Sequence, residues 1–251
     1  MNFDAVSFGV LGPAFLAGLL VLATHVPLGQ QVLQRGIVFI DLAVAQVAAL
    51  GLLAADFMAW EPQGWRMQAV ATGAALLAAL MLTWMEKHWP EVQEALIGAM
   101  FVLAATAALM LLAHNPHGGE HLQEVLAGQI LWVTWSDLPP LALVSLLLCV
   151  AWFRFAPHLG RAGFHVIFAI AVTASVQLVG VYLVFSSLIL PALAVRNWKP
   201  THRLPAAYLI GAAAYLIGLA ISALFDLPSG AVIVWSLAFT GLAANIRRRY
   251  D

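Results

Sequence analysis

A few polar side chains lie inside apolar runs, where they could do chemistry. Asp41 and Gln46 interrupt the run FIDLAVAQVAALG (39–51), His25 lies near the end of an earlier run, and Gln177 lies within a later one. Ionisable and amide groups are costly inside a bilayer, so they usually face a cavity, a partner or a substrate path. We therefore predict that these four side chains line a path through a membrane.

Each of the four also has a purely structural explanation. Gln46 and Gln177 could join helices by hydrogen bonds, and Asp41 and His25 could extend towards a nearby membrane interface. In a helix, positions 41 and 46 differ by roughly 140° around the axis. Two metal ligands on one helix need a spacing of three or four residues. Asp41 and Gln46 therefore do not make a metal site by themselves.

A second group of possible ligands lies in the loop HNPHGGEH. His114, His117, Glu120 and His121 have spacings that bring imidazoles within reach of one transition-metal ion, and Gly118–Gly119 lets the chain turn back. The loop predicts a weak metal contact. The alternative is a polar turn between two helices.

The composition excludes a soluble domain. Hydrophobic residues make up 63% of the 251 residues and charged residues only 9%, whereas charged residues are roughly a quarter of an ordinary globular chain. The net charge of -1 argues against a nucleic-acid partner. No basic region precedes the first apolar run, so we expect that run to be a retained helix.

Eight apolar segments, each bounded by Pro, Gly or charge, predict an all-α polytopic membrane protein with about eight transmembrane helices. We expect one transmembrane permease domain over residues 1–251. The predicted segments are 5–28, 36–58, 67–85, 92–113, 138–154, 164–187, 205–225 and 230–246.

The positions of lysine and arginine predict the orientation. Eight spans place both termini on one side, and the basic run 247–249 places that side in the cytoplasm. The predicted cytoplasmic side then also holds Arg66, Arg196, Lys199 and Arg203. The opposite side holds Arg35, Lys87, Arg154 and Arg161.

Sequence motifs of common enzymes are missing. The chain has no HExxH, no GxSxG and no GxxxxGK[ST] phosphate-binding loop. We therefore expect a transport subunit that is not an enzyme. If transport uses ATP, the ATPase must be a separate chain.

Several stretches, in order, resemble the permease subunits of bacterial ABC importers for zinc, manganese and iron, the ABC-3 family. They are THVPLGQQVLQRGIVFIDLAVAQVAALG, EALIGAMFVLAATAALML, VLAGQILWVTWSDL, VQLVGVYLVFSSLILPALAVR and FDLPSGAVIV. The resemblance spans 24–234 and implies a vitamin B12-importer-like bundle in the bacterial inner membrane. It also implies a homodimer, an ATP-binding subunit and an extracytoplasmic metal-binding protein as partners.

The stretch ILPALAVR (189–196) resembles the cytoplasmic segment that contacts the ATPase in this family. The resemblance assigns that role to Leu190, Pro191, Ala192 and Arg196. The residue types agree with this role: a proline is expected to interrupt the helix at the cytoplasmic end, and basic residues follow it. The alternative is the simple end of a span.

The second helix departs from the family pattern of an Asp followed four residues later by the His of a Ser-His pair. Aligned on Gly51, the Asp position falls on Leu42 and Ser-His falls on Ala45–Gln46. Asp41 is displaced by one residue, and an amide is a poorer transition-metal ligand than imidazole. The family's metal site is therefore altered in this chain.

Together these observations predict a permease that translocates a divalent metal ion, zinc or manganese, and holds no permanent cofactor. A permease of the same architecture could instead move a metal chelate or a small organic solute. From other classes, the chain could be a metal-sensing membrane protein using the His-rich loop, or a membrane enzyme, although no acid–base pair lies within the spans.

Overall fold

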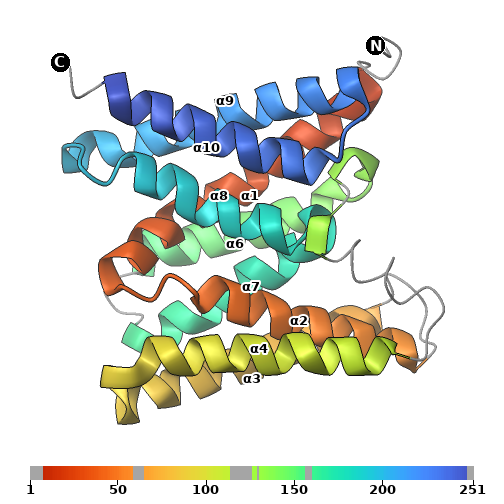
Figure 1. Ribbon diagram of the computed structural model, residues 1–251, viewed down its shortest axis with the longest axis vertical. Coiled ribbons are helices and arrows are strands. Elements are labelled where there is room, and N and C mark those ends of the chain that lie inside the picture. Colours follow the sequence, from red (N-terminus) through yellow and green to blue (C-terminus); the bar gives the residue numbers. More distant parts are fainter. Residues whose placement is uncertain (1–7, 59–64, 114–125, 129, 156–159, 248–251) are drawn as a thin grey trace.

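The computed structural model describes residues 8–58, 65–113, 126–128, 130–155 and 160–247 (Figure 1). Within these ranges every regular element is helical. In chain order the elements are α1 (Phe8–Arg35), α2 (Ile40–Phe57), α3 (Trp65–His88), η2 (Pro90–Val92), α4 (Gln93–Leu112), η3 (Ile130–Trp132), α6 (Leu138–Phe155), α7 (Gly160–Val179), α8 (Val181–Ala194), α9 (Pro200–Phe225) and α10 (Ser229–Arg247).

The helices confirm an all-α polytopic membrane protein. Among the described residues, six helical stretches are long and apolar enough to cross a bilayer: Gly9–Arg35, Arg66–His88, Pro90–Leu112, Leu138–Phe155, Gly160–Val179 and Pro200–Phe225. Three apolar helices are shorter, at Ile40–Ala55, Val181–Ala194 and Ser229–Asn245.

The predicted segment 164–187 is two helices rather than one. α7 ends at Val179, α8 starts at Val181, and Gly180 between them has a φ of 80°, a conformation that only glycine adopts without strain. A Cβ on Gly180 would lie 2.3 Å from the backbone nitrogen of Gly128, so the segment around residue 128 packs directly on this turn. The sequence did not show the break because both sides of Gly180 are apolar.

The additional turn changes the topology of the bundle. α1 and α9 are antiparallel, since Gly18 packs on Tyr215 and Gly211 packs on Leu22. α9 and α10 are antiparallel as well, with Gly218 against Ile233. The start of α1 and the end of α10 therefore lie at opposite ends of the bundle (Figure 1). The count of eight crossings, from which we expected both termini on one side of the membrane, did not include the turn at Gly180.

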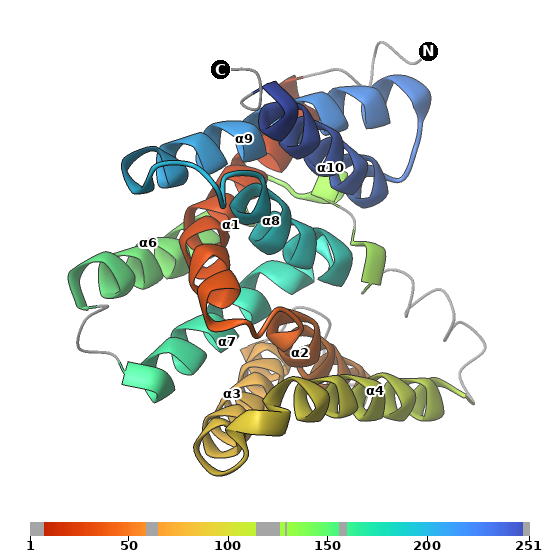
Figure 2. The same ribbon diagram turned by 60° about the vertical axis from the view of Figure 1, so that its left-hand side comes forward.

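The helices form two groups with α7 between them (Figures 1 and 2). α2 packs against α3 and α4 in one group, and α1 packs against α8, α9 and α6 in the other. α7 contacts α3 and α2 on one side and α6 and α1 on the other. Small residues permit the close approach within the first group: a Cβ on Gly51 of α2 would lie 3.0 Å from Cβ of Ala74 in α3.

Candidate functional site

α2 places two of the predicted path residues inside the protein. Asp41 lies in the first turn of α2 and its side chain is 0% exposed, while Gln46 is 2% exposed. Both carboxylate oxygens of Asp41 are buried and have no hydrogen-bond partner among the described residues. The structural alternative was that Asp41 extends towards the membrane interface, and a fully buried side chain does not do so. A buried carboxylate without a partner is costly unless it is neutralised by a proton or a cation.

The start of α4 adds polar groups that the sequence reasoning did not select. The backbone N–H of Phe39, two residues before Asp41, donates to Oε1 of Glu94 at 3.3 Å. Oε2 of Glu94 and Nε2 of Gln93 are buried without hydrogen-bond partners in the described part of the chain. The only sequence signal for them was their position at the polar start of an apolar run. The turn between α1 and α2 thus lies against unsatisfied oxygen and amide groups.

His25 lies in the interior of α1 and is fully buried. Its Nδ1 is 2.9 Å from the carbonyl oxygen of Val21 and 2.9 Å from Oγ1 of Thr24. A proton on Nδ1 is donated to the Val21 carbonyl, which leaves Nε2 as a lone-pair atom in the neutral ring. Nε2 is buried and unpartnered among the described residues. No hydrogen bond or ion pair within those residues joins His25 to Asp41 or Gln46.

Gln177 lies near the end of α7 and joins two helices. Its Oε1 accepts a hydrogen bond from Nε2 of Gln68 in α3. This contact is at the opposite end of α3 from Glu86, because α3 and α7 are antiparallel. The helix-joining alternative describes what Gln177 does in this structure, although its Nε2 is buried without a partner in the described chain.

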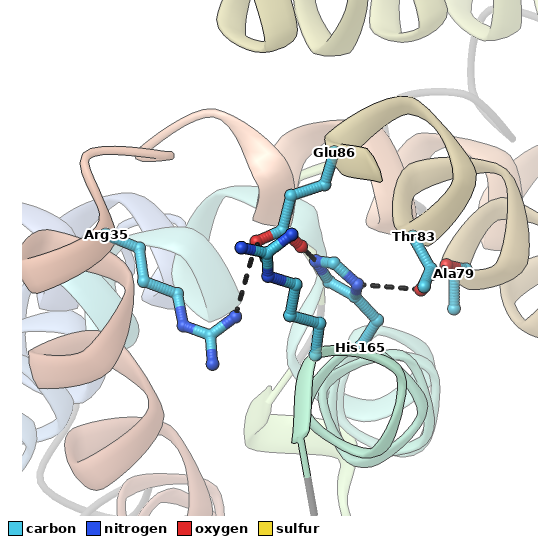
Figure 3. Close-up of polar contacts among 6 residues, drawn as sticks. Arg35, Ala79, Thr83, Glu86 and His165 are labelled. Atoms are coloured by element: carbon cyan, nitrogen blue, oxygen red, sulfur yellow. Dashed lines mark hydrogen bonds and ion pairs between the residues drawn. The ribbon is translucent and has the colours of Figure 1, made fainter. Parts of the chain in front are cut away.

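A charged cluster that the sequence reasoning missed joins α1, α3 and α7 (Figure 3). Glu86 in the last turns of α3 lies 3.3 Å from Nε of Arg161, 4.0 Å from Nη1 of Arg35 and 3.7 Å from Nε2 of His165. Nδ1 of His165 is 2.8 Å from Oγ1 of Thr83. The available signals were the i, i+4 spacing of Arg161 and His165 and the i, i+3 spacing of Thr83 and Glu86.

The other predicted ligand group, His114, His117, Glu120 and His121, lies outside the described residues. Within the described ranges, no group of three or more His, Cys, Asp or Glu side chains is placed to hold a metal ion.

The predicted ATPase-contact segment forms the end of α8 and the turn that follows. Pro191 lies inside α8, which continues to Ala194, so the expectation that Pro191 interrupts the helix is wrong. Pro191 and Ala192 are buried against the bundle, Leu190 is half-buried, and Arg196 is exposed. The proline is tolerated because α8 packs closely against α1 and α10, and this packing offsets one lost backbone hydrogen bond.

A sequence profile described as the ABC 3 transport family matches residues 7–160 and 156–248. This chain belongs to the ABC 3 transport family. The resemblance seen in the sequence is thereby confirmed, and the chain is the membrane permease part of an ABC transporter rather than its ATPase.

Two relatives support the ABC 3 assignment over nearly the full chain. The manganese transport system membrane protein MntC of Halalkalibacterium halodurans is 25% identical over 256 residues, which cover 92% of this chain and 85% of the relative. The membrane protein slr2045 of Synechocystis sp., described as uncharacterized, is 24% identical over 267 residues, covering 98% and 93%.

Solved structures show the same fold as this ABC 3 permease. A chain of PsaBC from Streptococcus pneumoniae in complex with Fab superposes with a TM-score of 0.73 at 21% identity, covering 94% of this chain and 89% of that one. A chain of an inward-facing ABC transporter described as of metal-chelate type gives 0.65 at 19% identity, covering 89% and 81%.

Proposed function

We propose that this ABC 3 permease moves divalent metal ions, manganese or zinc, into the cell. The observation that carries the proposal is the fully buried, unpartnered carboxylate of Asp41 on a helix enclosed by α3, α4 and α7. Inside a membrane protein such a group marks an ion pathway by default. The similarity to a protein named for manganese transport supports the same cargo.

The chemistry of α2 suits a hard or borderline cation. Asp41 supplies carboxylate oxygens and Gln46, five residues on, supplies an amide oxygen, and such ligands favour manganese over softer ions. His25 offers an imidazole nitrogen from α1 that would suit zinc. Ligands this sparse hold an ion weakly, which allows it to leave as well as enter. Gln177 is the least supported of the four path residues because its oxygen already accepts from Gln68.

The distribution of cations supports a definite orientation. Eight of the nine arginines and lysines in the described ranges lie at one end of the bundle, where α1, α3, α6, α8 and α10 end and α7 and α9 begin (Figure 1). They are Arg35, Lys87, Arg154, Arg161, Arg196, Lys199, Arg203 and Arg247; only Arg66 lies at the other end. By the positive-inside rule the basic end is cytoplasmic, so α10 ends in the cytoplasm and α1 begins outside.

This orientation agrees with the ATPase-docking role that we propose for residues 189–196. The turn between α8 and α9 carries exposed Arg196 and Lys199 at the basic end. An ATP-binding subunit would dock there, an extracytoplasmic metal-binding protein would deliver cargo at the opposite end, and a second copy of the chain would complete the path as a homodimer. Residues 1–251 act as one permease domain of the inner membrane.

Uptake by the assembled transporter tests the function. Proteoliposomes containing the permease and its ATPase should accumulate manganese when ATP is supplied, and competition with zinc, iron and magnesium ranks the cargo. If a metal is taken up only as its chelate, the chelate is the cargo. The amide of Gln46, which stands where the family has an imidazole, favours this alternative. No ATP-dependent uptake of any metal would contradict the proposal.

A further inference from the structure

Glu86 is the centre of a cluster that crosses between the two helix groups (Figure 3). Its single carboxylate, 15% exposed, faces Arg161 and His165 of α7 and Arg35 of α1. α3 belongs to the group with α2 and α4, whereas α1 belongs to the group with α8 and α9. The carboxylate therefore adds a polar contact between α3 and α1, which belong to different groups.

The contacts to His165 are shielded from water. His165 is 1% exposed, and its two ring nitrogens face Oγ1 of Thr83 at 2.8 Å and Oε2 of Glu86 at 3.7 Å, both on α3. A buried polar group costs free energy when its partner is lost, so the contacts of this imidazole hold α7 against α3. The guanidinium of Arg35 is fixed as well, because it lies 4.2 Å above the ring centroid of Phe164.

The seam between α3 and α7 is held differently at its two ends. At the basic end it carries Glu86, Arg161 and His165, and at the other end it carries the neutral Gln68–Gln177 amide pair. Between these two ends α3 carries buried alanines, among them Ala75, Ala78 and Ala79. The charges are thus confined to the end that we assign to the cytoplasm.

The charged cluster is connected to Asp41 by a short turn. Arg35 is the last residue of α1, Gly36 follows with a φ of 71°, and α2 begins at Ile40. Phe39 in this turn is tied to Glu94 of α4 through its backbone N–H. A movement of α3 away from Arg35 would therefore act on the turn that carries the first residues of α2, including Asp41.

We propose that Glu86, ion-paired with Arg161 and Arg35 and facing the buried imidazole of His165, forms a latch that closes the basic end of the permease over Asp41. The latch is a positioning device: it touches no cargo, and it must break when α3 moves away from α1 and α7 to open this chain's part of the path on that side. This inference rests on the proposed transport function, since it assigns a regulated gate to the same path. The excess of positive charge around one carboxylate argues against a metal site in the cluster itself.

A thiol placed next to Asp41 reports the state of the latch without requiring transport. In a Cys149→Ser background, Ala45→Cys puts a thiol one helical turn from Asp41 at a position that is 0% exposed. Its reaction rate with a charged maleimide is measured on the permease–ATPase complex in nanodiscs without ATP. Glu86→Gln is compared with Glu91→Gln, an exposed acid of η2 at the same end.

Glu86→Gln should raise the labelling rate by about tenfold because it shifts the complex towards the open state, and Glu91→Gln should leave it unchanged. If Glu86→Gln does not yield a folded complex, Arg161→Gln removes the shortest ion pair from an exposed position and should raise the rate too. Equal rates in the parent and both latch variants would overturn the latch. Raised labelling without any metal uptake would instead retain the latch and contradict the proposed cargo.

Discussion

His165 in α7 and Glu86 in α3 face each other across the helix seam, with 3.7 Å between Nε2 and Oε2. The other ring nitrogen, Nδ1, meets Oγ1 of Thr83, so both nitrogens of one buried imidazole contact the same neighbouring helix. These contacts hold α3 against α7. The hydroxyl of Thr83 bonds both to a carbonyl of its own helix and to the imidazole of α7.

Replacing Thr83 by valine should therefore destabilise the seam. The change keeps the shape but leaves Nδ1 of His165 buried without its partner, which costs about 1–3 kcal/mol. Thermal denaturation of the purified complex should show a lower midpoint. The matched control is Thr106→Val in α4, whose exposed hydroxyl bonds only to carbonyls of its own helix; equal midpoints for the two variants would contradict the assignment.

Asp41→Asn should separate stability from transport. Removing a buried, unpartnered carboxylate relieves a desolvation cost, so the complex should be as stable as the parent or more stable. Metal uptake should fall by about tenfold or more, because the amide cannot supply the negative charge that compensates a cation. Proteoliposome uptake and thermal midpoints measure the two effects. Unchanged uptake would remove Asp41 from the path.

Gly180→Ala should prevent correct folding of the α7–α8 turn. Gly180 has a φ of 80°, and its Cβ would lie 2.3 Å from a backbone nitrogen and 2.6 Å from Cα of Gly128. Both the strain and the collision involve backbone that cannot move independently. Gly98→Ala in α4 is the control, because a Cβ there meets nothing within 4 Å and should stabilise the helix by up to about 1 kcal/mol. Yield and monodispersity in detergent distinguish the two; normal yield of Gly180→Ala would contradict the close approach.

The orientation can be tested at the two ends of α9. In the Cys149→Ser background, Leu227→Cys places an exposed thiol after α9, and Lys199→Cys places one before it. A membrane-impermeant thiol reagent applied to intact spheroplasts should label Leu227→Cys at once and Lys199→Cys only after permeabilisation. The reverse pattern would invert the proposed topology.

Reversing the charge of Arg196 should weaken docking of the ATPase. Arg196 is exposed in the turn after α8, whereas Pro191 and Ala192 are buried and are expected to act only by holding the end of that helix. Arg196→Glu should lower the amount of ATPase that co-purifies with the permease. Arg154→Glu, an exposed cation at the end of α6, is the control. Equal recovery of ATPase with both variants would argue against docking at Arg196.

The class of the protein and most of its helices follow from local features of the amino-acid sequence. A chain with 63% hydrophobic and 9% charged residues has no soluble alternative, and Pro, Gly and charge marked most of the helix ends. Asp41 and Gln46 were also identifiable, because a polar residue in an apolar run is a local signal. They can be identified without knowing which residues pack around them in the folded protein.

The end of the bundle that each loop occupies depends on packing between distant segments and could not be predicted from the sequence. The reversal at Gly180 lies within a continuous apolar run, and it depends on a close backbone approach by Gly128, which is distant in sequence. This one turn changes which end of the bundle every earlier loop shares with the end of α10, including the loops of Arg35, Lys87 and Arg161. The latch was hidden for the same reason: Glu86 and His165 carry no shared local pattern, and only the packing of α3 on α7 brings the carboxylate and the imidazole together.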